Sequence, residues 1–121
     1  MKISILLPYK ENFSPEYPGA VSLFVYETSK ISKFKKLINV YGNTNYKKKF
    51  NLKYKKIDLK KKLFSSQTND YVKKYITLEK KNDSSIIEVH NRPSYIHLIN
   101  QELKNRILTL YFHNDPLSMD G

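Results

Sequence analysis

The sequence contains no cysteine. That absence excludes disulfide bonds, metal sites built on thiolates and cysteine nucleophiles, and it is compatible with a reducing compartment. Long apolar runs are also missing, because none approaches the roughly 20 residues that a membrane-spanning helix needs. The apolar start of the chain is too short for the core of a signal peptide, and it continues into Pro8 rather than into a cleavage site. We therefore interpret it as a buried strand.

Glycine and arginine are both scarce. The chain has three glycines in 121 residues, and neither G-x-G-x-x-G nor G-x-x-x-x-G-K-[ST] occurs, so the sequence encodes no glycine-rich phosphate loop. Although the net charge is +11, arginine occurs only as Arg92 and Arg106. Phosphate sites favour arginine because its planar fork holds two oxygens at once. The lysine excess therefore indicates compositional bias and solubility more than a phosphate-binding surface.

Alternating strands and helices are the main pattern that the sequence does carry. Short apolar runs predict strands at residues 3–7, 37–42, 86–90 and 107–112, and a lysine-rich edge strand within residues 50–59. Helical spacing predicts helices over residues 20–34, from Ser65 or Ser66 to about residue 81, and from about Pro93 onward. This order implies an α/β fold, a Rossmann-like parallel sheet with helices on both faces.

The domain organisation follows from the length and from the last strand. A chain of 121 residues is enough for one domain with one modest core. We expect residues 1–121 to form a single domain. We also expect that domain to be incomplete, because no helix follows the last predicted strand to cover it.

Polar clusters follow three of the predicted strands. In parallel α/β sheets, ligands bind beyond the carboxyl ends of the strands, near the point where the strand order reverses. Residues 8–19, 90–94 and 113–115 all fall at such strand ends. The first cluster includes Gly19 and Ala20, which open the first helix. There a small residue lets the backbone approach a ligand, and the positive helix end favours anions. The alternative is that Gly19 only caps the helix.

The other two clusters share a His-Asn pair directly after an apolar strand. His90, Asn91 and Arg92 supply hydrogen-bond donors for a hydroxyl or a phosphate, unless the loop merely shapes a turn. His113-Asn114-Asp115 repeats the pattern after the last strand. Histidine and aspartate so close together could begin a metal site, but no third ligand is evident. We therefore predict no metal and no bound cofactor, and we favour a site for sugar hydroxyls.

Two lysine triplets form a separate feature, at residues 47–49 and 60–62. They alternate with Tyr46, Phe50, Tyr54 and Phe64, and interleaved basic and aromatic residues can bind single-stranded nucleic acid. A basic, non-enzymatic nucleic-acid-binding module is therefore the alternative function. A nucleotide-binding α/β domain of another class is a weaker rival. We favour a solvated sheet edge with packed aromatic residues, for which an anionic membrane surface is a better partner than nucleic acid.

Four segments resemble the N-terminal domain of GT-B-fold retaining glycosyltransferases of the family-4 type, which build bacterial surface glycans. They are Lys2-Ile3-Ser4-Ile5-Leu6-Leu7-Pro8, Pro18-Gly19-Ala20-Val21, Ile86-Ile87-Glu88-Val89-His90-Asn91-Arg92-Pro93 and Leu110-Tyr111-Phe112-His113-Asn114-Asp115-Pro116. They occur in the order of the family, and the last two are the most specific. The family usually has Gly-Gly where this chain has Pro18-Gly19.

The resemblance implies a function and a set of roles. The enzyme would transfer a hexose from a nucleotide sugar to a glycan or lipid-linked acceptor during cell-surface polysaccharide (lipopolysaccharide) synthesis. It would work in the cytoplasm or at the inner face of the membrane. His113 would be the catalytic residue beside the transferred sugar, and the turn at Gly19 and Ala20 would approach the donor phosphates and the acceptor. The acceptor cleft would be lined by Glu88, His90, Asn91 and Arg92, and extended by Asn114 and Asp115.

The same resemblance implies that this chain is half of a catalytic unit. In the family, a second Rossmann-like domain holds most of the nucleotide sugar through paired glutamates and basic phosphate contacts. That C-terminal domain is absent from this sequence, so we expect the chain alone to be inactive as a transferase.

Overall fold

The computed structural model describes residues 1–60 and 66–113 of the chain. Within these residues, five strands form one sheet in the order β3-β2-β1-β4-β5, and every neighbouring pair is parallel. The strands are β1 (Ile3–Leu6), β2 (Ile38–Gly42), β3 (Tyr54–Lys56), β4 (Ile86–His90) and β5 (Ile107–Tyr111). The central strands are short and almost wholly buried, as the apolar runs predict.

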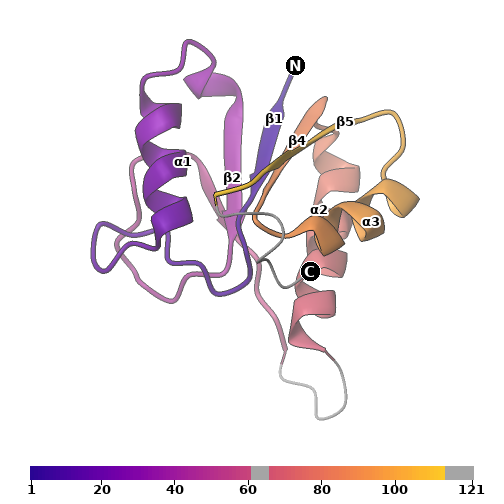
Figure 1. The fold of residues 1–121 in the computed structure, drawn as a ribbon, viewed down its shortest axis with the longest axis horizontal. Coiled ribbons are helices and arrows are strands. Elements are labelled where there is room, and N and C mark those ends of the chain that lie inside the picture. Colours follow the sequence, from indigo (N-terminus) through magenta and orange to yellow (C-terminus); the bar gives the residue numbers. More distant parts are fainter. Residues whose placement is uncertain (61–65, 114–121) are drawn as a thin grey trace.

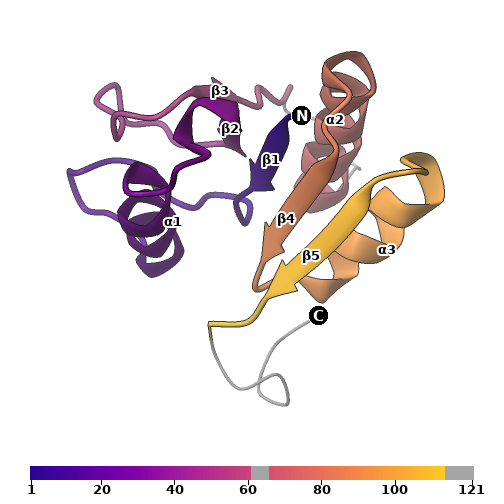
Figure 2. The same ribbon diagram turned by 90° about the horizontal axis from the view of Figure 1, so that it is seen from above.

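Helices cover both faces of this sheet (Figures 1 and 2). They are α1 (Ala20–Lys30), α2 (Gln67–Asn82) and α3 (Pro93–Glu102), and a short 3-10 helix, η1 (Lys35–Leu37), precedes β2. Figure 2 shows α1 on one side of the sheet and α2 with α3 on the other. The predicted Rossmann-like α/β fold with helices on both faces is therefore confirmed.

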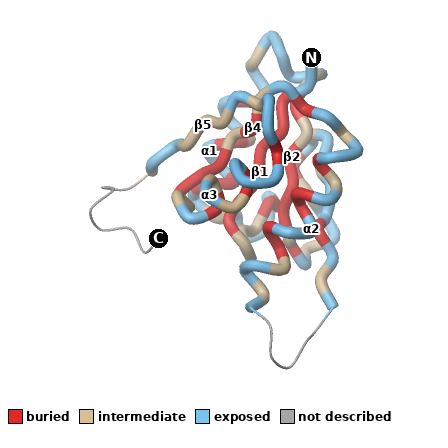
Figure 3. The backbone as a smooth tube through the Cα atoms, turned by 90° about the vertical axis from the view of Figure 1, so that its right-hand side faces the viewer, coloured by how far each residue is buried: buried red, intermediate tan, exposed pale blue. Residues whose placement is uncertain are grey.

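The core consists of two layers separated by the sheet. On the α1 side, Val21 and Val25 pack in one cluster with Ile5 and Val40. On the opposite side, side chains of α2 and α3 pack in a second cluster with β1, β2 and β4: Leu6, Tyr41, Tyr71, Tyr75, Val89, Tyr95 and Ile99. Alternate residues of each strand supply the two layers, because successive side chains point to opposite faces. Figure 3 shows how the buried residues concentrate in the central strands.

The predicted start of α2 is confirmed at Ser66. Its side-chain oxygen accepts a hydrogen bond from the backbone N–H of Asn69, at 3.3 Å, so it caps the helix. The helix ends at Asn82, and the capping residue Asp83 has left-handed backbone angles and donates its N–H to the carbonyl of Glu79. These local signals explain why the bounds of this helix could be predicted closely.

Five predicted elements are longer than those observed, two of them, β1 and β2, by one residue. The first helix ends at Lys30 rather than at residue 34, and Ile31, within its predicted range, is 80% exposed. The edge strand is reduced to Tyr54–Lys56, because the residues before it run as a loop whose Phe50 ring packs on Phe13 and Tyr26. The last strand ends at Tyr111, one residue early.

The strand order reverses next to β1. From β1 the chain moves to β2 and β3 on one side of the sheet, and then crosses to β4 and β5 on the other. The carboxyl ends of β1 and β4 therefore flank the position where ligands bind in open α/β sheets. In the part of the chain that the structure describes, no helix is both long and apolar enough to cross a membrane.

Candidate functional site

Two histidines meet at the carboxyl ends of β4 and β5. His90 ends β4 and pairs in register with Tyr111 of β5, and His113 follows two residues later. Residues two apart along an extended chain point to the same side, so this register brings the imidazoles together. Nδ1 of His90 lies 2.8 Å from Nε2 of His113, which is hydrogen-bond distance. The two histidines predicted as site residues are therefore neighbours in space.

Asn91 holds the two strand ends in place. Its backbone N–H donates to the carbonyl oxygen of Tyr111, at 2.9 Å. Its side-chain oxygen accepts the backbone N–H of His113, at 2.7 Å. Asn91 has φ +56°, in the left-handed region that asparagine tolerates better than most residues. This geometry gives Asn91 a positioning role in the site.

Aromatic rings frame the histidine pair. The ring of Tyr111 stacks on His90 with centroids 5.0 Å apart and planes 8° apart. Phe24 of α1 meets His113 edge-on, with centroids 4.8 Å apart. Helical spacing places Phe24 within the predicted first helix but gives no sign of this contact. The 41% exposure of Phe24 shows that its ring lies at the rim of the core.

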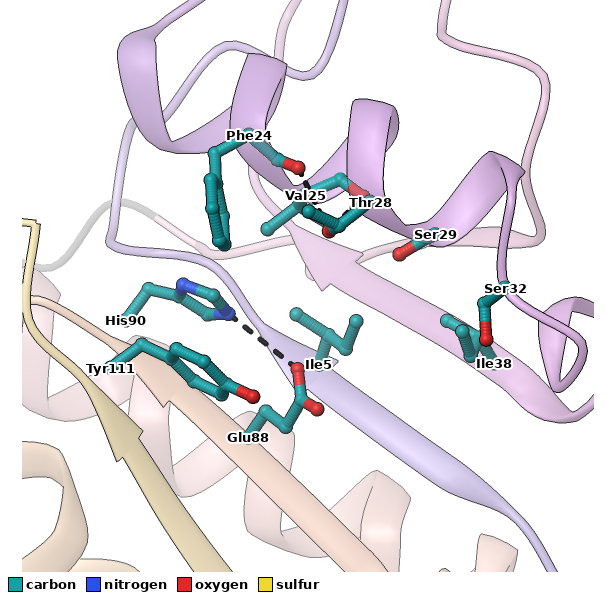
Figure 4. Close-up of a pocket in the computed structure, with 10 residues that line it drawn as sticks. All are labelled: Ile5, Phe24, Val25, Thr28, Ser29, Ser32, Ile38, Glu88, His90 and Tyr111. Atoms are coloured by element: carbon teal, nitrogen blue, oxygen red, sulfur yellow. Dashed lines mark hydrogen bonds and ion pairs between the residues drawn. The ribbon is translucent and has the colours of Figure 1, made fainter.

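A small groove runs from His90, one of the two histidines, along α1 (Figure 4). It has a volume of about 200 Å³ and is lined by Phe24, Val25 and Thr28 on one side and by Glu88, His90 and Tyr111 on the other. Oε2 of Glu88 lies 3.7 Å from Nε2 of His90. The groove thus combines aromatic surface with a carboxylate and an imidazole, contributed by α1, β4 and β5.

The environment of His113 favours its neutral form. Burial lowers the pKa of this imidazole below its usual 6.5, and the neighbouring His90 lowers it further. The carboxylate of Glu11 acts in the opposite direction. His113 is therefore expected to be uncharged at neutral pH, with one ring nitrogen able to accept a proton.

Glu11 occupies the start of α1. One of its carboxylate oxygens accepts the backbone N–H of Ser22, at 3.0 Å, so the positive helix end is already partly neutralised. Gly19 makes this possible, because a Cβ at position 19 would overlap the Glu11 carboxylate. Gly19 has ordinary extended angles (φ −69°), so it is needed for space and not for an unusual backbone conformation. A donor phosphate at this turn would have to displace Glu11.

We expect Gly19→Ala to lower the free energy of unfolding by about 1 kcal/mol, because the displaced Glu11 no longer caps α1. Urea denaturation measures the change. Glu11→Ala removes the same cap, so the double variant should lose little more than either single variant. Fully additive losses would show that Gly19 acts through something other than Glu11.

The remaining predicted site residues are spread out. Arg92 is turned toward its own strand end, where Nη1 donates to the carbonyl oxygen of Asn91 at 2.7 Å. Burial raises the pKa of the Tyr95 hydroxyl, and Arg92 partly offsets that rise. Ala20 is exposed at the first position of α1. Asn114 and Asp115 lie outside the described residues, so their predicted roles stay predictions.

The aromatic residues near the first lysine triplet are engaged in packing. Phe50 stacks on Tyr26 with ring centroids 4.3 Å apart, and Tyr54 stacks on Phe13 with centroids 5.3 Å apart. Lys49 lies over the outer part of Tyr54. A nucleic-acid base would have to displace these contacts to stack here. Of the second triplet, Lys61 and Lys62 lie outside the described residues, as does Phe64.

Comparison with known proteins adds no family to this picture. No protein-family model, curated protein or solved structure matches this chain. Within residues 1–60 and 66–113, the side chains form no group of three or more histidine, aspartate or glutamate residues placed to hold a metal ion. The chemistry of the candidate site therefore has to be argued from the histidine pair and its surroundings.

Proposed function

We propose that this chain is the acceptor-side domain of a retaining hexosyltransferase with the GT-B architecture. It would bind a glycan or lipid-linked acceptor that receives a hexose from a nucleotide sugar during cell-surface polysaccharide synthesis. The observation that carries the proposal is the hydrogen-bonded pair of His90 and His113, held by Asn91 at the carboxyl ends of β4 and β5.

The groove beside the pair supports an acceptor sugar as ligand. Its volume of about 200 Å³ is smaller than the roughly 300–1,000 Å³ of pockets that enclose drug-sized molecules. It suits one sugar ring better than an entire nucleotide sugar. Phe24 and Tyr111 offer apolar faces for the C–H groups of the sugar, and Glu88 and His90 offer hydrogen-bonding atoms for its hydroxyls.

The contacts at the start of α1 favour a donor site that lies mostly on a second domain. Because Glu11 already accepts a backbone N–H there, the turn at Gly19 has little left to offer a diphosphate. In the proposed enzyme a second domain supplies most of the donor contacts. The proposal includes a cytoplasmic location with peripheral contact to the anionic inner face of the membrane, for which the lysine-rich surface supplies positive charge.

Calorimetric titration of the chain with a panel of acceptor glycans and nucleotide sugars tests the proposal. We expect at least one glycan to bind, and His113→Ala to weaken that binding by about tenfold, or about 1.4 kcal/mol. His97→Ala is the matched control, since His97 is exposed on α3 and contacts Gln101. Absence of binding to every glycan and nucleotide sugar would refute the proposal. Salt-sensitive binding to RNA in its place would favour the nucleic-acid-binding module.

A further inference from the structure

We propose that His113 is a general base for a substrate hydroxyl, acting through Nδ1, and that Glu88 sets its tautomer through His90. The proposal rests on the proposed function in one respect, which is that the hydroxyl belongs to the acceptor sugar. His113 is the residue that would touch the reacting oxygen. Glu88 and His90 are positioning residues.

Three side chains form a continuous line of polar atoms. Oε2 of Glu88 lies 3.7 Å from Nε2 of His90, and Nδ1 of His90 lies 2.8 Å from Nε2 of His113. His90 is 1% exposed, and among the described residues its Nε2 has no hydrogen-bond partner. Leaving a buried N–H without a hydrogen-bond partner costs free energy. The Glu88 carboxylate is the group that offsets this cost at Nε2 of His90.

The contacts among Glu88, His90 and His113 determine which ring nitrogens carry protons. A neutral imidazole has one donor nitrogen and one acceptor nitrogen. The Glu88 carboxylate favours the proton of His90 on Nε2, which leaves Nδ1 of His90 as an acceptor. His113 must then donate from its own Nε2, and the lone pair of His113 lies on Nδ1. The stacked ring of Tyr111 and the edge-on ring of Phe24 keep the imidazoles in this arrangement.

The charged groups around His113 favour its action as a general base. Burial and His90 lower its pKa, so the neutral form is available near pH 7. Glu11, in the loop between β1 and α1, raises the pKa and thereby stabilises the imidazolium once it forms. Glu88 on β4 adds a second carboxylate behind His90. The guanidinium of Arg92 faces the carbonyl oxygen of Asn91.

The proposed step transfers one proton and one glycosyl group. The bond from the anomeric carbon to the phosphate oxygen of the donor breaks and the nucleoside diphosphate leaves, while the acceptor oxygen bonds to that carbon from the same face, so that the configuration is retained. The proton of the acceptor hydroxyl goes to Nδ1 of His113. The resulting imidazolium keeps its Nε2 proton in the hydrogen bond to His90, with Glu88 balancing the charge, and it loses the extra proton to solvent after the product leaves.

Long-range ¹H–¹⁵N correlation spectra of the free chain, labelled at its three histidines, test this assignment without any ligand. At pH 7.5 we expect the ring protons of His90 and His113 to lie on Nε2, and His113 to be neutral because its pKa is lowered below the usual 6.5. In Glu88→Leu, His90 should lose this preference, and the Nδ1-protonated form of His113 should increase. Glu27→Leu is the control, because Glu27 pairs with Lys30 on the surface of α1.

Either of two results would overturn the proposal. One is a proton on Nδ1 of His113 in the unmodified chain at pH 7.5. The other is an unchanged tautomer of both histidines when Glu88 is replaced. If Glu88→Leu does not fold, Glu88→Gln keeps the shape and removes the charge, and the same comparison applies. Failure of glycan binding with the expected tautomers intact would instead remove the proposed function and leave the tautomer assignment standing.

Discussion

In the proposed transferase, replacing His113 with alanine is expected to slow hexosyl transfer by between ~10² and ~10⁴-fold, the usual contribution of a general base. The loss should appear in kcat, because the proton is accepted only as the acceptor oxygen attacks. His113→Gln keeps hydrogen-bonding capacity but cannot take up the proton, so it should lose a similar factor in kcat and keep the KM for the acceptor. The assay supplies nucleotide sugar, acceptor and the donor-binding domain.

His97→Ala is the control for this experiment, since it makes the same chemical change on the exposed side of α3. We expect the rate of this variant to match that of the unmodified chain. A His113→Ala variant with unchanged kcat would exclude His113 as the base. An effect confined to the KM for the acceptor would reduce its role to binding.

Tyr71→Ala will lower the free energy of unfolding by about 4 kcal/mol, in the range for large aromatic residues removed from a core. Tyr71 is fully buried on α2, and its hydroxyl donates to the carbonyl oxygen of Leu7, at 2.6 Å. Burial raises its pKa well above 10.0, so the hydroxyl stays protonated and remains a donor. The variant loses apolar burial and leaves the carbonyl of Leu7 without this partner.

Urea denaturation followed by circular dichroism measures this loss. Tyr71→Phe removes the hydroxyl alone and should cost about 1–3 kcal/mol. Tyr17→Ala, at a residue that is 80% exposed, should change stability by less than about 0.5 kcal/mol. Because domains of this kind are stable by only about 5–15 kcal/mol, Tyr71→Ala is expected to unfold at a distinctly lower urea concentration than the unmodified chain. A loss of stability no larger than that of Tyr17→Ala would contradict the burial of Tyr71 between α2 and the sheet.

The hydrogen bond from Tyr71 to Leu7 also links the core of the domain to the candidate site. Leu7 directly follows β1, and its backbone leads into the loop that carries Glu11 and Gly19. The hydroxyl of Tyr71 thus connects the layer formed by α2 and α3 to the carboxyl end of β1. The histidine pair lies at the same edge of the sheet. Loosening this contact should increase hydrogen exchange in the loop before it unfolds the whole domain.

The sequence was sufficient to predict five strands, four of them to within one residue at each end, because strand positions depend on local patterns. The strand at Ile86–His90 was predicted with its observed bounds, since its apolar run is closed sharply by Asn91 and Arg92. The short β3 was predicted too long. The burial of Phe50 comes from contacts with Phe13 and Tyr26, which are remote in sequence and leave no periodic pattern in the segment itself.

The candidate site was predicted in outline, and its geometry was not. His90 and His113 were identified because both follow apolar strands. Their hydrogen bond depends on the register of β4 and β5, which pairs His90 with Tyr111 and which spacing alone does not determine. Phe24 was missed because helical spacing cannot distinguish a core residue from one at the rim. Glu11 was missed because its contact with Ser22 depends on how the loop folds back onto α1.

Mapping a bound acceptor glycan on the amide and histidine resonances of the chain tests the central claim most directly. We expect the largest shifts upon titration on His113, Asn91 and Phe24, around the groove between α1 and the ends of β4 and β5. Shifts confined to the lysine-rich residues 46–56, or no shifts with any glycan, would contradict the central claim.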